Sequence, residues 1–265
     1  KKQGFTTNYY ISPQVWASRA SRVKDIKRDI DNMFVILPFE KKFYEKYNYN
    51  VSFVGHPLID AIAERKKVDE LAFRQEYALT NLPIIALLPG SRKQEITKML
   101  LVMLSIVEDF SEYQFVIAGA PSQDLSFYQK IIGNRKICFI KNQTYDLLSV
   151  SHAALVASGT ATLEAALFKV PQVVCYKGGT VSYQIAKRII TLKFISLVNL
   201  IMNKEVVKEL IQKDFNKKHL KTALTKILDH SHREKLISAY VDLENKLGGK
   251  GASEKVAKQI VANLK

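Results

Sequence analysis

The fold is decided by the stretch Ala154-Leu155-Val156-Ala157-Ser158-Gly159-Thr160-Ala161-Thr162-Leu163-Glu164. A short apolar run, typical of a buried strand, ends in three small residues, and a helical pattern begins directly after them. In an open α/β sheet, ligands bind in the loops that follow the carboxyl ends of the strands. Small residues let a diphosphate approach the backbone amides, and the N-terminus of a helix favours its negative charge. The stretch therefore indicates a phosphate site, with the Glu164 carboxylate placed to accept hydrogen bonds from both hydroxyls of a ribose.

The same stretch also fits a helix start without any ligand. Ser158 can act as an N-cap, and an acid such as Glu164 stabilises the first turns of any helix through the helix dipole. On this stretch alone the two interpretations are evenly matched.

A second loop of this kind is Leu88-Pro89-Gly90-Ser91-Arg92, which follows an apolar run at residues 84–88 and precedes a long helical pattern. Gly90 permits a tight turn close to a ligand, and the start of the helix attracts anions. Arg92 adds a permanently charged planar fork suited to phosphate. The alternative is a plain turn in which Arg92 pairs with Glu95. We favour the phosphate because the loop follows a strand.

A third group of polar residues begins at Ser196-Leu197-Val198-Asn199 and continues with Glu205, Glu209 and Gln212. The last three stand at helical spacing, which predicts one polar face of a short helix. Amide and carboxylate groups on such a face can hydrogen-bond a sugar or a uracil edge. A solvated surface is the alternative.

Short apolar runs alternate with longer helical patterns along the chain, which predicts an α/β fold with parallel sheets. Strands are predicted at residues 7–11, 33–37, 51–54, 84–88, 115–118, 136–140, 154–157 and 172–176. Helices are predicted at residues 21–29, 40–47, 94–110, 125–132, 144–149, 162–168 and 181–190. After Asn199 the pattern predicts helices alone, ending with residues 253–264.

A domain boundary is predicted between Pro57 and Pro83, where a charged helical stretch separates two strands. We expect residues 1–63 to be the remainder of an N-terminal Rossmann-like domain and residues 64–82 to be a linker. Residues 83–248 would form the second Rossmann-like domain, and the C-terminal helix within residues 249–265 would pack back on the first.

The composition favours a polyanionic partner. The net charge is +15 over 265 residues, which suits nucleic acid, an anionic membrane or a phosphorylated substrate. No RNA-binding aromatic motif accompanies the charge, so we do not expect a nucleic-acid partner. Cys138 and Cys175 lie in apolar runs and are expected to be reduced core thiols. No His/Cys spacing suggests zinc, and no apolar run is long enough for a membrane span.

Through six motifs in the same order, the sequence resembles the lipid-A-disaccharide synthase family over essentially its whole length. The motifs are Ser12-Pro13-Gln14-Val15-Trp16-Ala17 with Arg22, Leu37-Pro38-Phe39-Glu40, Phe53-Val54-Gly55-His56-Pro57-Leu58, the two loops above, and the stretch from Val173 through Lys187-Arg188 to Asn199 and Gln212. Ser18 stands where the family usually has an aromatic residue, and Val198 where it usually has a proline.

The resemblance implies a GT-B glycosyltransferase with two Rossmann-like domains. It would join UDP-2,3-diacylglucosamine to 2,3-diacylglucosamine 1-phosphate, inverting the anomeric centre and releasing UDP. Arg92 would act in catalysis by stabilising charge on the departing UDP. The donor-binding residues implied are Gly90, Ser91, Arg92, Ser158, Gly159, Thr160, Glu164, Asn199 and Gln212. No metal and no cofactor are expected, because Arg92 and the helix terminus supply the counter-charge.

The beginning of the sequence departs from the family. Lys1-Lys2-Gln3-Gly4 reads like the last turn of a helix, and the family's opening Gly-Glu-Ala-Ser-Gly-Asp motif is not in the sequence. We therefore expect the first domain to be incomplete and the general base to lie outside these residues. His56 is expected to be structural, and the chain alone is expected to bind UDP while lacking the base.

The family works at the cytoplasmic face of the inner membrane of Gram-negative bacteria, which suggests a peripheral enzyme docked on anionic lipid. The helix at residues 21–29, with Arg22, Lys24, Lys27 and Arg28, is the candidate surface. The sequence leaves a homodimer open. Alternative functions are a peptidoglycan-precursor transferase, a UDP-N-acetylglucosamine 2-epimerase, or a non-catalytic nucleotide-binding or nucleic-acid-binding module.

Overall fold

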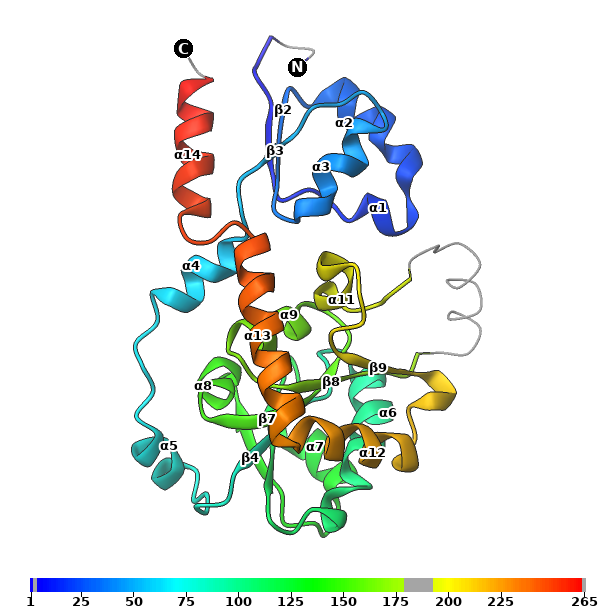
Figure 1. Ribbon diagram of the computed structural model, residues 1–265, viewed down its shortest axis with the longest axis vertical. Coiled ribbons are helices and arrows are strands. Elements are labelled where there is room, and N and C mark those ends of the chain that lie inside the picture. Colours follow the sequence, from blue (N-terminus) through cyan, green and yellow to red (C-terminus); the bar gives the residue numbers. More distant parts are fainter. Residues whose placement is uncertain (2–3, 179–192, 264–265) are drawn as a thin grey trace. The chain divides into compact units, whose positions relative to one another are not determined.

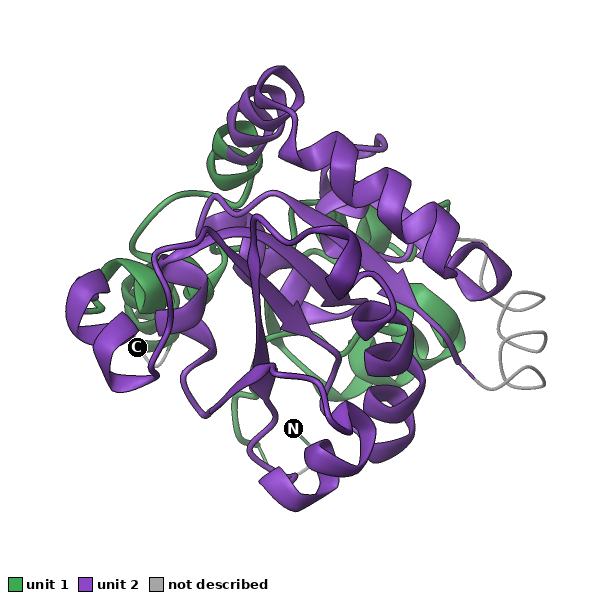
Figure 2. Cartoon of the chain, turned by 90° about the horizontal axis from the view of Figure 1, so that it is seen from below, with its two compact units in different colours: residues 1–65, 184–193, 241–265 green, residues 66–183, 194–240 purple. Residues whose placement is uncertain are grey.

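The structure is a computed structural model that describes residues 1, 4–178 and 193–263. The described residues divide into two compact units, which are coloured separately in Figure 2. Residues 1, 4–65, 193 and 241–263 form the first unit, and residues 66–178 and 194–240 form the second.

The first unit is built on a parallel sheet with the strand order β1-β2-β3. Its apolar side chains, among them Val23, Met33 and Tyr44, form a core against one face of that sheet. The strands are β1 (Asn8–Tyr10), β2 (Asn32–Val35) and β3 (Ser52–Phe53), and the helices between and after them are α1 (Val15–Ser18), η1 (Ala20–Arg22), α2 (Val23–Asp29), α3 (Pro38–Glu45) and α4 (Pro57–Ala63).

The C-terminal helix α14 (Ala252–Ala262) also belongs to the first unit. Its buried Val256 contacts Phe34 of β2 and Val54, which follows β3. The carboxylate of Asp60 in α4 accepts the backbone N–H of Gly251 at 2.7 Å, at the start of α14. Helix α14 is thus held by apolar packing and by a hydrogen bond at its N-terminus.

The second unit contains a parallel sheet with the order β6-β5-β4-β7-β8-β9. This is the doubly wound order, in which the chain first builds outward from β4 and then crosses back to start again at β7. The ligand crevice of such sheets lies at that point, between β4 and β7. The strands are β4 (Ile84–Leu88), β5 (Gln114–Gly119), β6 (Cys138–Lys141), β7 (Ser151–Ala157), β8 (Gln172–Tyr176) and β9 (Lys208–Ile211).

Helices cover both faces of this sheet (Figure 1). One face packs on α8 (Thr144–Ser149) and α9 (Thr160–Leu167) through residues such as Leu147 and Ala165. On the opposite face, α6 (Lys93–Leu104) contacts both α7 (Leu125–Ile132) and α12 (Lys217–Leu228). The central strand β4 is therefore buried on both sides, and its five residues are all apolar, as expected for a parallel sheet.

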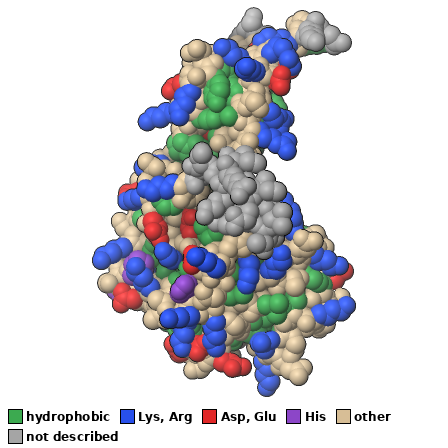
Figure 3. Space-filling view, turned by 90° about the vertical axis from the view of Figure 1, so that its right-hand side faces the viewer, with side chains coloured by type: hydrophobic (Ala, Val, Ile, Leu, Met, Phe, Trp, Pro, Cys, Tyr) green, Lys and Arg blue, Asp and Glu red, His purple; other side chains and the backbone are tan. Residues whose placement is uncertain are grey.

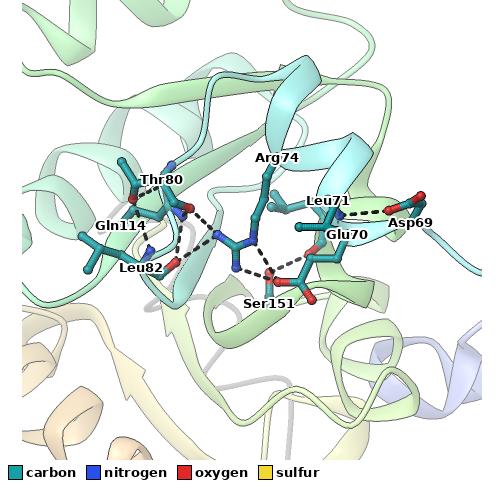
Figure 4. Close-up of polar contacts among 9 residues, drawn as sticks. Asp69, Glu70, Leu71, Arg74, Thr80, Leu82, Gln114 and Ser151 are labelled. Carbon is teal, nitrogen blue, oxygen red and sulfur yellow. Dashed lines mark hydrogen bonds and ion pairs between the residues drawn. The ribbon is translucent and has the colours of Figure 1, made fainter.

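Residues 64–82, which we expected to be a linker, contain the docked helix α5 (Glu70–Glu76). Phe73 of α5 is buried in the core of the second unit. The Arg74 guanidinium pairs with Glu70 at 2.7 Å and donates to the carbonyl of Leu82 at 3.1 Å, while Gln114 of β5 donates to that same carbonyl at 2.8 Å (Figure 4). These bonds attach the segment to the second unit from Lys66 onward.

The prediction of helices alone after Asn199 is wrong. Residues Lys208–Ile211 form β9, which pairs in parallel with β8, and the short turn η3 (Gln212–Asp214) follows. Pairing with β8 overrides the local helical spacing of this charged stretch. The helices α11 (Leu197–Met202), α12 and α13 (His230–Lys246) surround it in the chain. The helix predicted at residues 181–190 lies outside the described residues.

Candidate functional site

A cavity of about 320 Å³ lies where the carboxyl ends of β4, β5 and β7 meet. It occupies the switch point of the doubly wound sheet, which is where such sheets bind their ligands. Every donor residue predicted from the two loops lines it, and so does the predicted ribose acid. These residues are Gly90, Ser91, Arg92, Ser158, Gly159, Thr160 and Glu164.

Gly90 gives the loop after β4 its shape. Its φ of +104° is one that residues with a side chain rarely adopt. A Cβ at this position would lie 3.1 Å from Oε2 of Glu95 and 3.6 Å from Cβ of Ala157 at the end of β7. The absence of a side chain thus brings the two loops together across the cavity.

Arg92 stands at the N-cap position of α6, and its side chain is 81% exposed. Its Nη1 donates to Oε1 of Glu95 at 3.1 Å, and both residues line the cavity. The pairing that we considered as the alternative to a phosphate contact is therefore present. Exposed pairs of this kind are weak, so an anion in the cavity can compete for the guanidinium.

In the loop after β7, the N-cap of α9 is Gly159 and not Ser158. The Ser158 hydroxyl instead donates to the carbonyl of Ile195 at 3.2 Å, and the Ser158 amide donates to the carbonyl of Cys175 at 3.0 Å. Thr160 and Ala161, whose amides begin α9 and have no acceptor within the helix, line the cavity, whereas the Thr162 amide donates to the carbonyl of Gly159 at 3.2 Å. This arrangement suits an anion. The alternative in which Ser158 acts only as the N-cap of the helix is not what the structure shows, because Gly159 holds that position.

Glu164 lies in the second turn of α9 and lines the cavity from the helix side. The hydroxyl of Tyr145 in α8 donates to its Oε1 at 3.1 Å. Burial raises the pKa of the Glu164 carboxyl, and the Tyr145 hydrogen bond lowers it by a smaller amount. A half-buried carboxylate in this position can accept hydroxyl groups of a sugar.

Asn199, which was predicted to contact the donor, is fully buried in α11 and does not line the cavity. Its Oδ1 accepts the backbone N–H groups of Val206 and Val207, at 2.7 and 3.0 Å. Its Nδ2 donates to the carbonyl of Val207 and to Glu209. The side chain thus satisfies its hydrogen-bonding capacity inside the protein and leaves nothing for a ligand.

The polar helix face predicted from Glu205, Glu209 and Gln212 does not exist. Glu209 belongs to β9 and accepts hydrogen bonds from Ile195, Ser196 and Asn199. Glu205 forms an exposed pair with Lys208 at 3.0 Å. Gln212 lies in η3 with φ +54°, away from the cavity lining, and its buried Nε2 has no hydrogen-bond partner in the described part of the chain.

The sequence analysis did not predict some of the residues that line the cavity. The loop after β5 contributes Ala120 and Pro121, and the start of α8 contributes Thr144. The first two follow a predicted strand, so the rule that pointed to the other loops also applied here. Tyr145 could not be found in this way, because its contact with Glu164 joins two helices that are distant in sequence.

Two further predictions concern residues outside the cavity. His56 is the N-cap of α4, where its Nδ1 accepts the amide of Leu58 at 3.2 Å, and burial lowers its pKa to about 4. This is a structural position. Within residues 1, 4–178 and 193–263, no helix has the length and apolar character needed to cross a bilayer.

Comparison with known proteins places the chain in a family. Residues 1–263 match the family described as Lipid-A-disaccharide synthetase. The chain is 38% identical to the lipid-A-disaccharide synthase of Syntrophus aciditrophicus (strain SB), with all of this chain and 71% of that protein aligned. It is 36% identical to the enzyme of Geobacter sulfurreducens, over 97% of this chain and 68% of that one.

Solved structures of the same fold are more distant in sequence. The UDP-GlcNAc 2-epimerase from Neisseria meningitidis bound to UDP-GlcNAc superposes with a TM-score of 0.64 at 16% identity, covering 98% of this chain and 70% of that one. The S. aureus MnaA–UDP co-structure gives a TM-score of 0.63 at 16% identity, covering 91% of this chain and 61% of that one. The likeness confirms the predicted α/β fold of GT-B type.

The two loops at the switch point, the order of the strands and the match along residues 1–263 agree with one another. The chain therefore belongs to the lipid-A-disaccharide synthase family and is a glycosyltransferase of lipid A biosynthesis, as its sequence motifs predicted.

Proposed function

We propose that the cavity binds the UDP part of a nucleotide-sugar donor. The observation that carries the proposal is that the Arg92 side chain and the N-terminus of α9 line one cavity at the switch point of the sheet. A cation and a set of helix amides facing the same space suit a diphosphate. The S. aureus and N. meningitidis neighbours, which are described with UDP and UDP-GlcNAc bound, support this choice of ligand.

In the bound state, the amides and hydroxyls of Ser158, Gly159 and Thr160 would hold the diphosphate. Arg92 would turn from Glu95 to the phosphates, because a dianionic ligand attracts it more strongly than one exposed carboxylate. Glu164, which also lines the cavity, would accept the ribose hydroxyls. Asn199 would act indirectly, through the backbone that it holds, while a donor contact by Gln212 stays a prediction.

The reaction proposed joins UDP-2,3-diacylglucosamine to 2,3-diacylglucosamine 1-phosphate. The bond between the anomeric carbon and the β-phosphate oxygen breaks, and the acceptor's 6-hydroxyl oxygen forms the new bond from the opposite face. UDP leaves with the bonding electrons, and its developing charge is stabilised by Arg92 and the α9 amides. The hydroxyl proton passes to a general base, which we assign to none of the described residues.

We further propose that the protein works on the cytoplasmic face of the inner membrane as a peripheral enzyme. Lys and Arg side chains are spread over the face shown in Figure 3, with fewer acidic ones among them. On α2 itself, Arg28 is paired with Asp25 and Asp29, which reduces its contribution. Arg22, Lys24 and Lys27 are exposed cations of this region that carry the proposal.

A calorimetric titration tests the donor site. UDP is expected to bind saturably and single-stranded RNA is expected not to bind. Product analysis with UDP-GlcNAc then addresses the epimerase alternative, for which UDP-ManNAc would appear. Tight RNA binding without UDP binding would remove the enzyme interpretation.

A further inference from the structure

We infer that Tyr145 is a positioning residue of the donor site, whose hydroxyl holds the Glu164 carboxylate in the orientation that receives the ribose. This inference rests on the ribose role proposed for Glu164. Tyr145 belongs to no motif of the sequence, and its own side chain is not part of the cavity lining. It acts through Glu164 and not on the donor itself.

The geometry fixes both ends of the Tyr145 side chain. Its hydroxyl donates to Oε1 of Glu164 at 3.1 Å. Its ring packs against the ring of Phe168 with centroids 5.3 Å apart and planes at 53°. Phe168 directly follows α9 and stands four residues after Glu164, so both contacts fall on one side of this helix.

One hydrogen bond to one oxygen is enough to orient a carboxylate. Glu164 has three side-chain torsions, and an unrestrained glutamate would lose this freedom when the ribose binds. With Oε1 held by Tyr145, the plane of the carboxylate is set before the ligand arrives, and its lone pairs toward the cavity stay available. Such preorganisation improves affinity, because less freedom is lost on binding.

The same bond acts on the charge of Glu164. Burial raises the pKa of this carboxyl, and the hydrogen bond from Tyr145 opposes the rise by stabilising the ionised form. Other titratable groups occur on the elements around it: Arg92 and Glu95 beside the cavity, Asp146 on α8, His152 on β7, and Cys175 and Tyr176 on β8. The pKa of Glu164 is shifted by burial and by Tyr145.

The experiment measures UDP affinity by calorimetry between pH 5 and 8 for the wild type, Tyr145→Phe, Glu164→Gln and the double variant. Phenylalanine keeps the ring that packs on Phe168 and removes only the hydroxyl. We expect Tyr145→Phe to weaken UDP binding about three- to tenfold at pH 7. We also expect the loss of affinity at low pH to begin at a higher pH than in the wild type, because the Glu164 pKa rises further.

The double variant separates positioning from a general structural effect. With Glu164→Gln present, position 164 carries no carboxylate, so Tyr145→Phe should cause no further change in the pH profile and add little to the loss of affinity. Tyr113→Phe, at the other end of the second unit's sheet, is the matched control and should bind UDP like the wild type.

An unchanged affinity and pH profile in Tyr145→Phe, or an equal loss in the Glu164→Gln background, would overturn the inference. If the wild type itself does not bind UDP, the proposed donor site is wrong, and the inference about Tyr145 is wrong with it. If the wild type binds UDP and Tyr145→Phe binds it equally well at every pH, only the inference about Tyr145 is wrong.

Discussion

Nδ2 of Asn199 donates a hydrogen bond of 2.8 Å to Oε1 of Glu209, and this pair joins helix α11 to the edge strand β9. Glu209 also accepts the backbone N–H groups of Ile195 and Ser196, both at 3.0 Å, and the Ser196 hydroxyl at 2.7 Å. The carbonyl of Ile195 accepts the hydroxyl of Ser158. The pair of buried Asn199 and half-buried Glu209 is thus connected to the phosphate loop through Ile195.

Removal of this carboxylate should destabilise the second unit. Glu209→Ala leaves two backbone amides, a hydroxyl and one N–H of the Asn199 side chain without their acceptor, and we expect a loss of about 3 kcal/mol in the free energy of unfolding. Urea denaturation measures it. Glu205→Ala is the control, because the Glu205–Lys208 pair is more than half exposed on both sides and its loss should cost under about 0.5 kcal/mol. Equal losses in the two variants would contradict a structural role for Glu209.

Arg92 should matter for transfer and little for stability. Its side chain is 81% exposed and, among the described residues, it pairs with Glu95, so Arg92→Ala should leave the melting temperature nearly unchanged. In an assay in which the wild type forms the disaccharide, we expect kcat/KM to fall about a hundredfold, because the charge on the departing UDP loses its counter-charge. Arg92→Lys keeps the charge without the planar fork and should recover part of the rate. Full activity of Arg92→Ala would remove Arg92 from the proposed mechanism.

A side chain at position 90 should harm both the loop and the ligand site. Gly90→Ala places a Cβ at φ +104° and 3.1 Å from the Glu95 carboxylate. We expect a cost of about 1–3 kcal/mol in stability and weaker UDP binding. Gly133→Ala provides the control, since Gly133 also has a positive φ, +63°, but its Cβ would meet no atom within 4 Å. Gly133→Ala should lose stability and keep its UDP affinity. A loss of UDP affinity in both variants would indicate that backbone strain in general, and not the position of Gly90 at the cavity, weakens binding.

Much of this fold could be predicted from the sequence, because apolar runs and loop residues are local features. The strands β4 and β8 have the predicted bounds, 84–88 and 172–176. Strand β9 could not be recognised, since Lys208-Glu209-Leu210-Ile211 is short, half polar and lies at the sheet edge, where local pattern is weak. Its existence depends on pairing with β8, which only the tertiary structure supplies.

The two loops of the candidate site could also be predicted from the sequence, but the hydrogen bonds between distant residues could not. Gly90 and Ser158 follow strands, and the rule that ligands bind at carboxyl ends located both. The donor contact of Asn199 came from the family resemblance, and a local pattern could not correct it, because such a pattern cannot distinguish an amide that meets a ligand from one that is satisfied inside the protein. For the same reason Tyr145 went unnoticed, since its bond to Glu164 spans nineteen positions.

Binding to anionic membranes should depend on charge. We expect co-sedimentation with liposomes to rise with anionic lipid content and to fall with added salt. Reversal of Arg22 and Lys24 to glutamate should weaken binding by at least about thirtyfold, because each basic residue near the surface contributes about 1 kcal/mol and both contributions are lost. Lys204→Glu in the second unit serves as the control. Liposome binding that changes neither with the anionic lipid content nor with the salt concentration would contradict the proposal.

The stability of the first unit should depend on the protonation of Glu40. This carboxyl is 1% exposed, accepts the amide of Leu37 at 2.9 Å, and has its pKa raised by burial from 4.5 to about 7. Below pH 4.5 the folded and unfolded chains both hold the proton. Between pH 4.5 and 7 only the folded chain does, so the contribution to stability is lost as the pH rises through about 7.

Glu40→Gln tests this sign, because the amide resembles the protonated acid and does not titrate. The free energy of unfolding of the wild type, measured in urea from pH 4 to 8, should fall relative to that of Glu40→Gln as the pH rises. His56 works in the opposite direction, since burial lowers its pKa to about 4 and its contribution is lost as the pH falls. Because both proteins contain His56, the difference between their free energies of unfolding reports the contribution of Glu40 alone. A difference that stays constant across this range would show that folding does not shift the pKa of Glu40.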